Sequence, residues 1–241
     1  MNEISMNKKS IEKDITGIVG LDRMLSGGFP AHHLVAVIGA FGTGKSTISM
    51  QFINHCLLEN KTCVYINLDV GEDQFLETAS MFGWDFEKYI EDEKLILITL
   101  SSADISTSIM KIEGAIPQFL ESTKVDCIVF DSITLLEMFH TSESERRNMM
   151  FNLCETFRNS GATTLLTSEA SVDDPYSSKF GILEYLVDGV IALRYVRPVG
   201  TYDVSLEMEV VRMRQTNHHR GSRPYTITEK GITVSVESEM F

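Results

Sequence analysis

Positive charge is scarce in this sequence. Its 241 residues include 21 Lys and Arg against 34 Asp and Glu, which gives a formal net charge of −13 and a pI near 4.9. The resulting field repels the phosphates of DNA and RNA, so binding through broad backbone neutralisation is disfavoured. Any role with nucleic acid would need a local basic patch.

Clustered cysteines, long apolar runs and a secretion signal are also lacking. The four cysteines lie far apart in apolar stretches without a CxxC pair, which predicts buried, reduced thiols and no metal site among them. They are Cys56, Cys63, Cys127 and Cys154. The first fourteen residues are polar, and no run of eighteen apolar residues occurs. We therefore expect a cytoplasmic protein without membrane insertion.

Apolar runs of strand length alternate with longer stretches of helical period, a pattern typical of an α/β fold with a mostly parallel sheet flanked by helices. The predicted strands are His33–Ile38, Cys63–Leu68, Leu95–Leu100, Cys127–Asp131, Thr163–Thr167 and Gly189–Tyr195. The predicted helices begin near Lys45, Asp73, Ile105 and Glu143. Alternation after Tyr195 predicts antiparallel strands that end in a C-terminal hairpin turned at Lys230 and Gly231. We expect a flexible tail at residues 1–14 and one domain at residues 15–241.

The stretch "GAFGTGKST" carries the strongest chemical signal. It satisfies the pattern G-x-x-x-x-G-K-[ST] between a predicted strand and a predicted helix, where backbone N–H groups and the positive helix end converge on an anion. The predicted ATP-binding residues are Gly39, Gly42, Thr43, Gly44, Lys45, Ser46 and Thr47. Lys45 is expected to hold the β- and γ-phosphates and Ser46 the Mg²⁺. The alternative is a glycine-rich turn with an exposed lysine.

A second carboxylate is needed to order the magnesium ion, and the apolar run "CIVFD" ends in Asp131. Asp131 is therefore the predicted Mg²⁺ partner of Ser46. Because Asp followed by Ser is also ordinary turn chemistry, a capping role for Asp131 is the alternative.

With these motifs placed, nearly the whole chain resembles the KaiC-type branch of the RecA-like P-loop ATPases. "TGIVGLDRMLSGGFPAHHLVAVIGAFGTGKS", "FGWDF", "FDSIT" and "EVVRMRQTNHHRGSRPYTITEKGITV" carry the resemblance, in the same order as in that family. The resemblance implies a homo-oligomer, in its most familiar form a hexameric ring, with ATP between subunits. Cations from the tail of one subunit then reach the γ-phosphate held by the next.

Arg212, Arg214 and His218 match the lysine, arginine and histidine of that family's tail segment. On an alternating strand Arg212 and Arg214 project to the same face, so both can address one oxyanion, and a positioned Arg can stabilise charge during phosphoryl transfer. The resemblance therefore assigns both arginines a catalytic role in trans and His218 a place at the nucleotide. The alternative is a solvated edge strand protected by charge.

Two departures from the family bear on activity. Asp69 and Val70 replace two adjacent glutamates that orient and activate the attacking water, so one carboxylate is shorter and the other is lost. Since a displacement of roughly 1 Å can cost about a hundredfold in rate, we predict slow hydrolysis, with Glu72 or Glu169 as possible substitutes. Glu184 and Tyr185 stand where the best-known relatives autophosphorylate a Ser-Thr pair, so clock-type autophosphorylation is not predicted.

Three functions are compatible with these motifs. The first is an oligomeric regulatory ATPase whose nucleotide state controls an unidentified protein partner. The second is a RecA- or RadA-like DNA-binding recombination ATPase, favoured only by the basic residues Arg212, Arg214, Arg220 and Arg223. The third is a nucleotide-binding scaffold of the motility-associated type, in which Asp69 and Val70 reflect lost catalysis.

Overall fold

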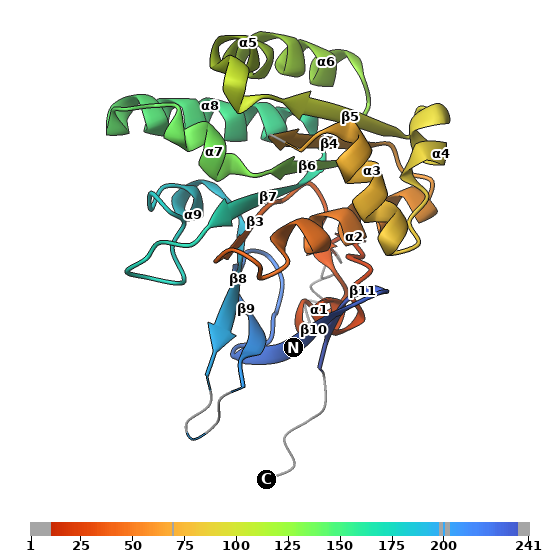
Figure 1. Cartoon of the computed structure of the whole chain (residues 1–241), viewed down its shortest axis with the longest axis vertical. Coiled ribbons are helices and arrows are strands. Elements are labelled where there is room, and N and C mark those ends of the chain that lie inside the picture. The colour runs from red at the N-terminus through yellow and green to blue at the C-terminus, as the bar shows by residue number, and fades with distance from the viewer. Residues whose placement is uncertain (1–10, 69, 198–199, 201–202, 236–241) are drawn as a thin grey trace, which may run out of the picture.

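The fold centres on one nine-stranded sheet (Figure 1). A computed structural model describes residues 11–68, 70–197, 200 and 203–235. The strand order is β11-β10-β9-β8-β3-β7-β6-β4-β5. The parallel strands are β3 (Leu34–Gly39), β4 (Cys63–Leu68), β5 (Leu95–Leu100), β6 (Cys127–Asp131), β7 (Thr163–Glu169) and β8 (Gly189–Val196). The antiparallel strands are β9 (Ser205–Met213), β10 (Ser222–Thr228) and β11 (Gly231–Val234).

The sequence predictions for the sheet are confirmed. All six predicted parallel strands are present with bounds that differ by two residues at most, because buried strands form continuous apolar runs. The C-terminal hairpin is also present: Thr228 pairs with Gly231 across the turn that joins β10 and β11. The α/β architecture with a mostly parallel sheet and an antiparallel end is thus correct.

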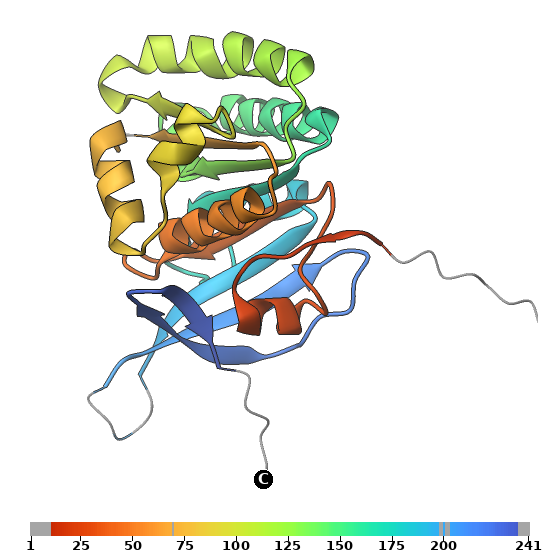
Figure 2. The ribbon, with the colours of Figure 1, turned by 90° about the vertical axis from the view of Figure 1, so that its right-hand side faces the viewer.

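Helices cover both faces of the sheet and bury two apolar cores (Figure 2). One face packs against α1 (Val19–Met24), α2 (Lys45–Leu58), α3 (Glu72–Met81) and α4 (Phe86–Glu91). The other lies under α5 (Ile105–Met110), the π-helical turn Lys111–Ala115, α6 (Ile116–Ser122), α7 (Ile133–Met138), α8 (Glu143–Ser160) and α9 (Leu183–Leu186). The four predicted helix starts are each within one residue of a true start. Among the described residues, no helix combines the length and apolar content needed to cross a bilayer.

Two residues of the expected tail form a short strand. Strand β1 (Lys13–Asp14) pairs with β2 (Phe29–Pro30) in a separate two-stranded sheet. Asp14 also accepts an ion pair from Lys61 at 2.8 Å, and the Lys13 ammonium donates to the carbonyl of Leu25 at 2.7 Å. These long-range contacts fix residues 13 and 14 to the domain. The first ten residues of the expected tail lie outside the described residues.

Gln51 links helix α2 to the C-terminal hairpin. Its buried amide nitrogen donates to the carbonyls of Gly17 (3.0 Å) and Ile232 (3.2 Å), and its oxygen accepts from the Ile232 N–H at 2.7 Å. Buried backbone groups that lose a partner cost about 1–3 kcal/mol each. One side chain therefore satisfies three backbone groups that helix and sheet leave unpaired.

Replacing Gln51 with leucine keeps the volume but removes these three bonds. We expect Gln51→Leu to lower the free energy of unfolding by about 2–4 kcal/mol in urea denaturation, because the carbonyls and the N–H stay buried without partners. Gln74→Leu, on the exposed face of α3, is the matched control and should change stability little. Equal stability of the two variants would contradict the bridging role of Gln51.

Glu137 is a buried carboxylic acid on α7. Its side chain is 0% exposed, and among the described residues neither carboxyl oxygen has a hydrogen-bond partner. Burial raises the pKa of Glu137 to about 8. The positive charges of Arg146 and Lys179 oppose this rise, and the negative charge of Glu184 adds to it. Glu137 is therefore largely protonated in the folded protein at neutral pH.

This raised pKa predicts stability that falls as pH rises. Between the ordinary carboxyl pKa of 4.5 and about 8 the folded state binds one more proton than the unfolded state, so this group contributes a slope of about −1.4 kcal/mol per pH unit. We expect Glu137→Gln to remove that slope in denaturation series across this range. The exposed control Glu121→Gln should retain it. Identical pH profiles for wild type and Glu137→Gln would refute the assignment.

Candidate nucleotide and magnesium site

The glycine loop joins β3 to α2, and its backbone requires glycine at residues 42 and 44. Gly42 and Gly44 have φ values of 75° and 84°, in the left-handed region that favours glycine. A Cβ at Gly42 would lie 2.6 Å from the Tyr195 hydroxyl, and one at Gly44 would lie 2.7 Å from Cδ1 of Ile227. The backbone itself therefore forms the cradle, and its N–H groups precede the positive end of α2.

Tyr225 holds this loop from the antiparallel end of the sheet. The buried Tyr225 hydroxyl on β10 donates to the Thr43 carbonyl at 2.6 Å. The Thr43 side chain is also buried and donates to the Ala40 carbonyl at 2.7 Å, so the hydroxyl of this predicted ligand stabilises the loop from within. Ser46 and Thr47 lie in the first turn of α2, Ser46 exposed and Thr47 half-buried.

Lys45 and two carboxylates meet at the same end of the sheet. The Lys45 ammonium donates to the carbonyls of Gly39 (2.8 Å) and Ala40 (3.0 Å). Burial lowers the pKa of Lys45, and the charges of Asp131 and Glu169 counteract that shift. Asp131 is held in place by the Tyr65 hydroxyl, which donates at 2.9 Å, and by the hydroxyl of Thr167. The arrangement brings together the predicted phosphate-binding lysine and the predicted magnesium carboxylate.

The donor set fits Mg²⁺ and a nucleotide phosphate. A serine hydroxyl and a carboxylate are the hard oxygen ligands that Mg²⁺ takes in such sites, where it keeps several waters. Gly42 and Gly44 leave no room for a Cβ beside Tyr195 and Ile227, so the loop backbone depends on glycine at both positions. When bound, Mg²⁺ would neutralise phosphate charge, with Ser46 and Asp131 as the residues able to hold it.

Asn67 is a polar residue of this site that sequence reasoning missed. It pairs in parallel register with Asp131, so the two side chains project from the same face of the sheet. It is 2% exposed, and among the described residues neither its amide nitrogen nor its amide oxygen has a hydrogen-bond partner. The sequence did contain a signal for Asn67, since it is a polar residue near the end of the apolar run "CVYINL". No sequence signal indicated a role for Tyr65, because its hydrogen bond to Asp131 depends on the register between β4 and β6.

The glutamates considered as substitutes for the lost pair have different surroundings. Glu169 ends β7 and pairs with Lys179 at 2.7 Å, so its charge is already partly neutralised. Glu72 is the exposed first residue of α3. Val70 packs against the apolar core, whereas Asp69 lies outside the described residues. Of the two substitutes, only Glu169 interacts with Lys45.

Both tail arginines contact the segment before β8: Arg212 lies on β9, and Arg214 follows the last residue of that strand. Arg212 donates to the carbonyls of Glu184 (2.5 Å) and Val187 (2.8 Å). Arg214 pairs with Asp188 at 3.1 Å, and its side chain is 52% exposed. His218 lies beyond them in a half-buried position, and one ring nitrogen is 3.1 Å from the His219 carbonyl.

Within one chain, the arginines and the glycine loop lie at opposite ends of the sheet. The Asp188 N–H bonds to Leu34 at the start of β3, whereas Gly39 at its end pairs with Leu193. Five residue steps along a parallel strand span about 16 Å. Arg212 and Arg214 are therefore not brought to the loop of their own chain.

Comparison with known proteins identifies the family of this chain. Residues 15–239 match the KaiC ATPase family. The circadian clock oscillator proteins KaiC of Prochlorococcus marinus subsp. pastoris and Synechococcus elongatus are 29% and 28% identical over 94% of this chain. These alignments cover 46% and 44% of the two relatives, so the chain spans about half their length.

A solved KaiC-like protein from Pyrococcus horikoshii matches the fold with a TM-score of 0.82 and 27% identity, over 94% of this chain and 100% of that one. The RecA-like core predicted from the sequence is thus confirmed. Since the family match extends over nearly all of the described residues and includes both the glycine loop and the tail arginines, the chain belongs to the KaiC family of ATPases.

Proposed function

We propose that this protein binds ATP with Mg²⁺ and hydrolyses it slowly, as a cytoplasmic homo-oligomer in which a second copy completes each site. The cradle formed by the left-handed glycines, with Lys45 and Asp131 at the same end of the sheet, carries the proposal. Backbone N–H groups and Lys45 bind the phosphates, and Ser46 with Asp131 holds the metal ion. An unidentified regulatory protein would read the nucleotide state.

The placement of the arginines supports a site shared between copies. The two ends of the sheet are too far apart for Arg214 to address a phosphate beside its own Lys45. A neighbouring copy that docks its arginine end against the loop would bring the cation to the γ-phosphate. Six copies in a closed ring are the arrangement that the family resemblance favours.

Slow turnover follows from the groups around the attacking water. Asp69 is one methylene shorter than the family's glutamate, and Val70 is partly buried against the core. Asn67 provides a buried donor and acceptor on the same face as Asp131, and is suited to orient water but not to accept its proton. The site is therefore expected to favour binding over chemistry.

Asp69 and Val70 support the alternative of a nucleotide-binding scaffold, which would bind ATP without cleaving it. Single-turnover hydrolysis of bound ATP separates it from the proposed ATPase. DNA recombination is disfavoured by the net charge of −13. Autophosphorylation is not expected, because Glu184 accepts hydrogen bonds from Ser178 and Tyr185 has replaced a phosphorylatable threonine or serine of the relatives.

A mixing experiment tests whether the site is shared. We expect Lys45→Ala and Arg214→Ala each to abolish most ATP hydrolysis, and a mixture prepared before ATP is added to recover part of it. Activity should recover because some interfaces in the mixture are complete. In these, an Arg214→Ala chain contributes an intact loop and a Lys45→Ala chain contributes an intact arginine. Phosphate release measured against mixing ratio provides the readout.

The matched control for this experiment is Arg220→Ala, which removes an exposed arginine from the same segment and should leave hydrolysis unchanged. Thermal unfolding of each variant shows whether loss of the contact with Asp188 disturbs the fold. Activity in Arg214→Ala alone, or no recovery on mixing with both variants folded and assembled, would exclude the shared site.

The departure at residues 69 and 70 predicts turnover below about one per second, since a displaced carboxylate costs on the order of a hundredfold. We expect Asp69→Glu with Val70→Glu to raise kcat by at least about tenfold while ATP affinity stays constant, because the added groups act on water and not on binding. Asp69→Asn is the control and should lower kcat. Fast wild-type turnover would show that another base serves the reaction.

A further inference from the structure

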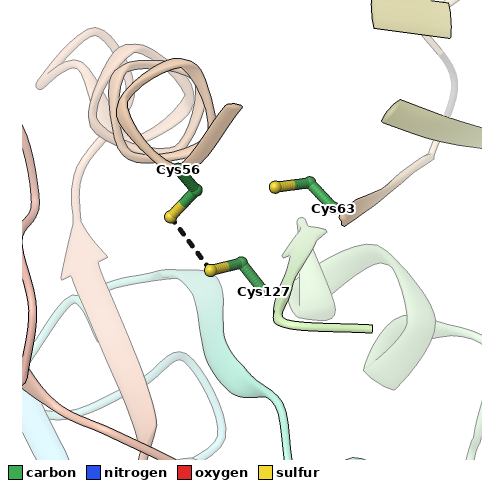
Figure 3. Close-up of side chains that lie close together, drawn as sticks. All are labelled: Cys56, Cys63 and Cys127. Atoms are coloured by element: carbon green, nitrogen blue, oxygen red, sulfur yellow. Dashed lines mark hydrogen bonds between the residues drawn. The ribbon is translucent and has the colours of Figure 1, made fainter. Parts of the chain in front are cut away.

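Three cysteines that are far apart in the sequence converge in the core (Figure 3). Cys56 lies near the end of α2, and Cys63 and Cys127 begin β4 and β6, where they pair in register. Their sulfur atoms all lie within 4.8 Å of one another, and those of Cys56 and Cys127 are 2.9 Å apart. The predicted burial of the thiols is confirmed, but their separation in the sequence did not reveal this cluster, because strand register and helix packing bring the three together. Cys154 belongs to the opposite core.

The spacing of the sulfur atoms suits a three-coordinate metal ion. Metal–sulfur bonds of about 2.3 Å in a trigonal plane set the sulfurs about 4.0 Å apart. The separation of 2.9 Å between Cys56 and Cys127 and the limit of 4.8 Å on the other two pairs are compatible with that value after small side-chain rotations. Figure 3 shows the three side chains directed toward one common space. Three converging thiols form a potential ligand set rather than a chance pair.

The donor set selects a soft ion of low coordination number. Sulfur ligands favour Cu⁺ and Zn²⁺ over Mg²⁺, Ca²⁺ and Mn²⁺. Among the described residues no imidazole or carboxylate joins the cluster, and all three cysteines are 0% exposed, which leaves no solvent-facing fourth position. Since structural Zn²⁺ sites are almost always tetrahedral, the cluster fits Cu⁺ better.

Binding exchanges protons for the metal ion. The thiolate is the metal-binding form of cysteine, so each thiol that binds the ion releases its proton to solvent, and no electron is transferred. The choice of Cu⁺ therefore follows from its preference for sulfur and from the three-coordinate geometry.

We propose that Cys56, Cys63 and Cys127 form a binding site for one Cu⁺ ion, independent of the nucleotide site. The cluster lies where β4 and β6 begin, and the magnesium carboxylate Asp131 lies where β6 ends. The connection at residues 59–62, which is exposed to half-exposed, adjoins the cluster and provides a route for an ion through local opening. The ion would connect the helix of the glycine loop to the strand that carries Asp131.

The test is an anaerobic titration of the reduced protein with Cu⁺ held by a chromophoric chelator in excess ascorbate. We expect wild type to remove one Cu⁺ per chain from the chelator. Single substitutions Cys56→Ala, Cys63→Ala and Cys127→Ala should each weaken binding by at least tenfold, because even a residue that only orients a metal ligand is worth about 10–100-fold in affinity. Zn²⁺ in a parallel titration should bind more weakly than Cu⁺.

Cys154→Ala is the matched control, since it removes an equally buried thiol outside the cluster and should retain full uptake. Thermal unfolding verifies that each variant is folded. For any variant that fails to fold, protection of three thiols from alkylation in copper-loaded wild type, followed by peptide mapping, identifies the ligands. No uptake by wild type, uptake unchanged in folded cluster variants, or protection of other cysteines would overturn the site.

Discussion

The backbone of the glycine loop, held open from the antiparallel end of the sheet, is the constraint on which the rest of this structure depends. A loop with two left-handed glycines offers a cradle only if something fixes it, and glycine by itself is the most mobile residue. Here Tyr225 bonds to the Thr43 carbonyl, Ile227 closes on Gly44, and the Tyr195 hydroxyl lies against Gly42. The C-terminal strands therefore act as the support of the phosphate-binding loop.

The same antiparallel ribbon carries the arginines at its other end. Strand β9 pairs with β8 over the whole length of β8, from Val196 near the glycine loop to Gly189 at the other end. At that other end, Arg212 and Arg214 contact the segment that precedes β8. Tyr195 and Tyr225 thus connect the loop to paired strands that extend to the arginines, with one shift of register between Val190 and Ile191. The loop and the arginines of one copy are therefore parts of the same antiparallel ribbon.

Local patterns in the sequence predicted the elements, and long-range register determined what the patterns could not reveal. Buried parallel strands read as apolar runs, and the glycine loop is a contiguous motif, so both were predictable. The roles of Asn67 and of the clustered cysteines were not predictable, because they depend on partners more than fifteen residues away. Strand β1 was not predictable because it is only two residues long. The place of the arginines relative to the loop likewise required the strand order.

The separation of loop and arginines constrains how copies can assemble. If each copy offers its loop to one neighbour and its arginines to another, the interface is heterologous, and such contacts generate either a closed ring or an open filament. In a two-fold dimer the same surface of each copy forms the interface. The loop of one copy could then meet the arginines of the other only if both features lay on that one surface. About 16 Å of intervening sheet argues against that arrangement. Within the proposed function, the geometry of a single copy therefore favours head-to-tail assembly before any partner is considered.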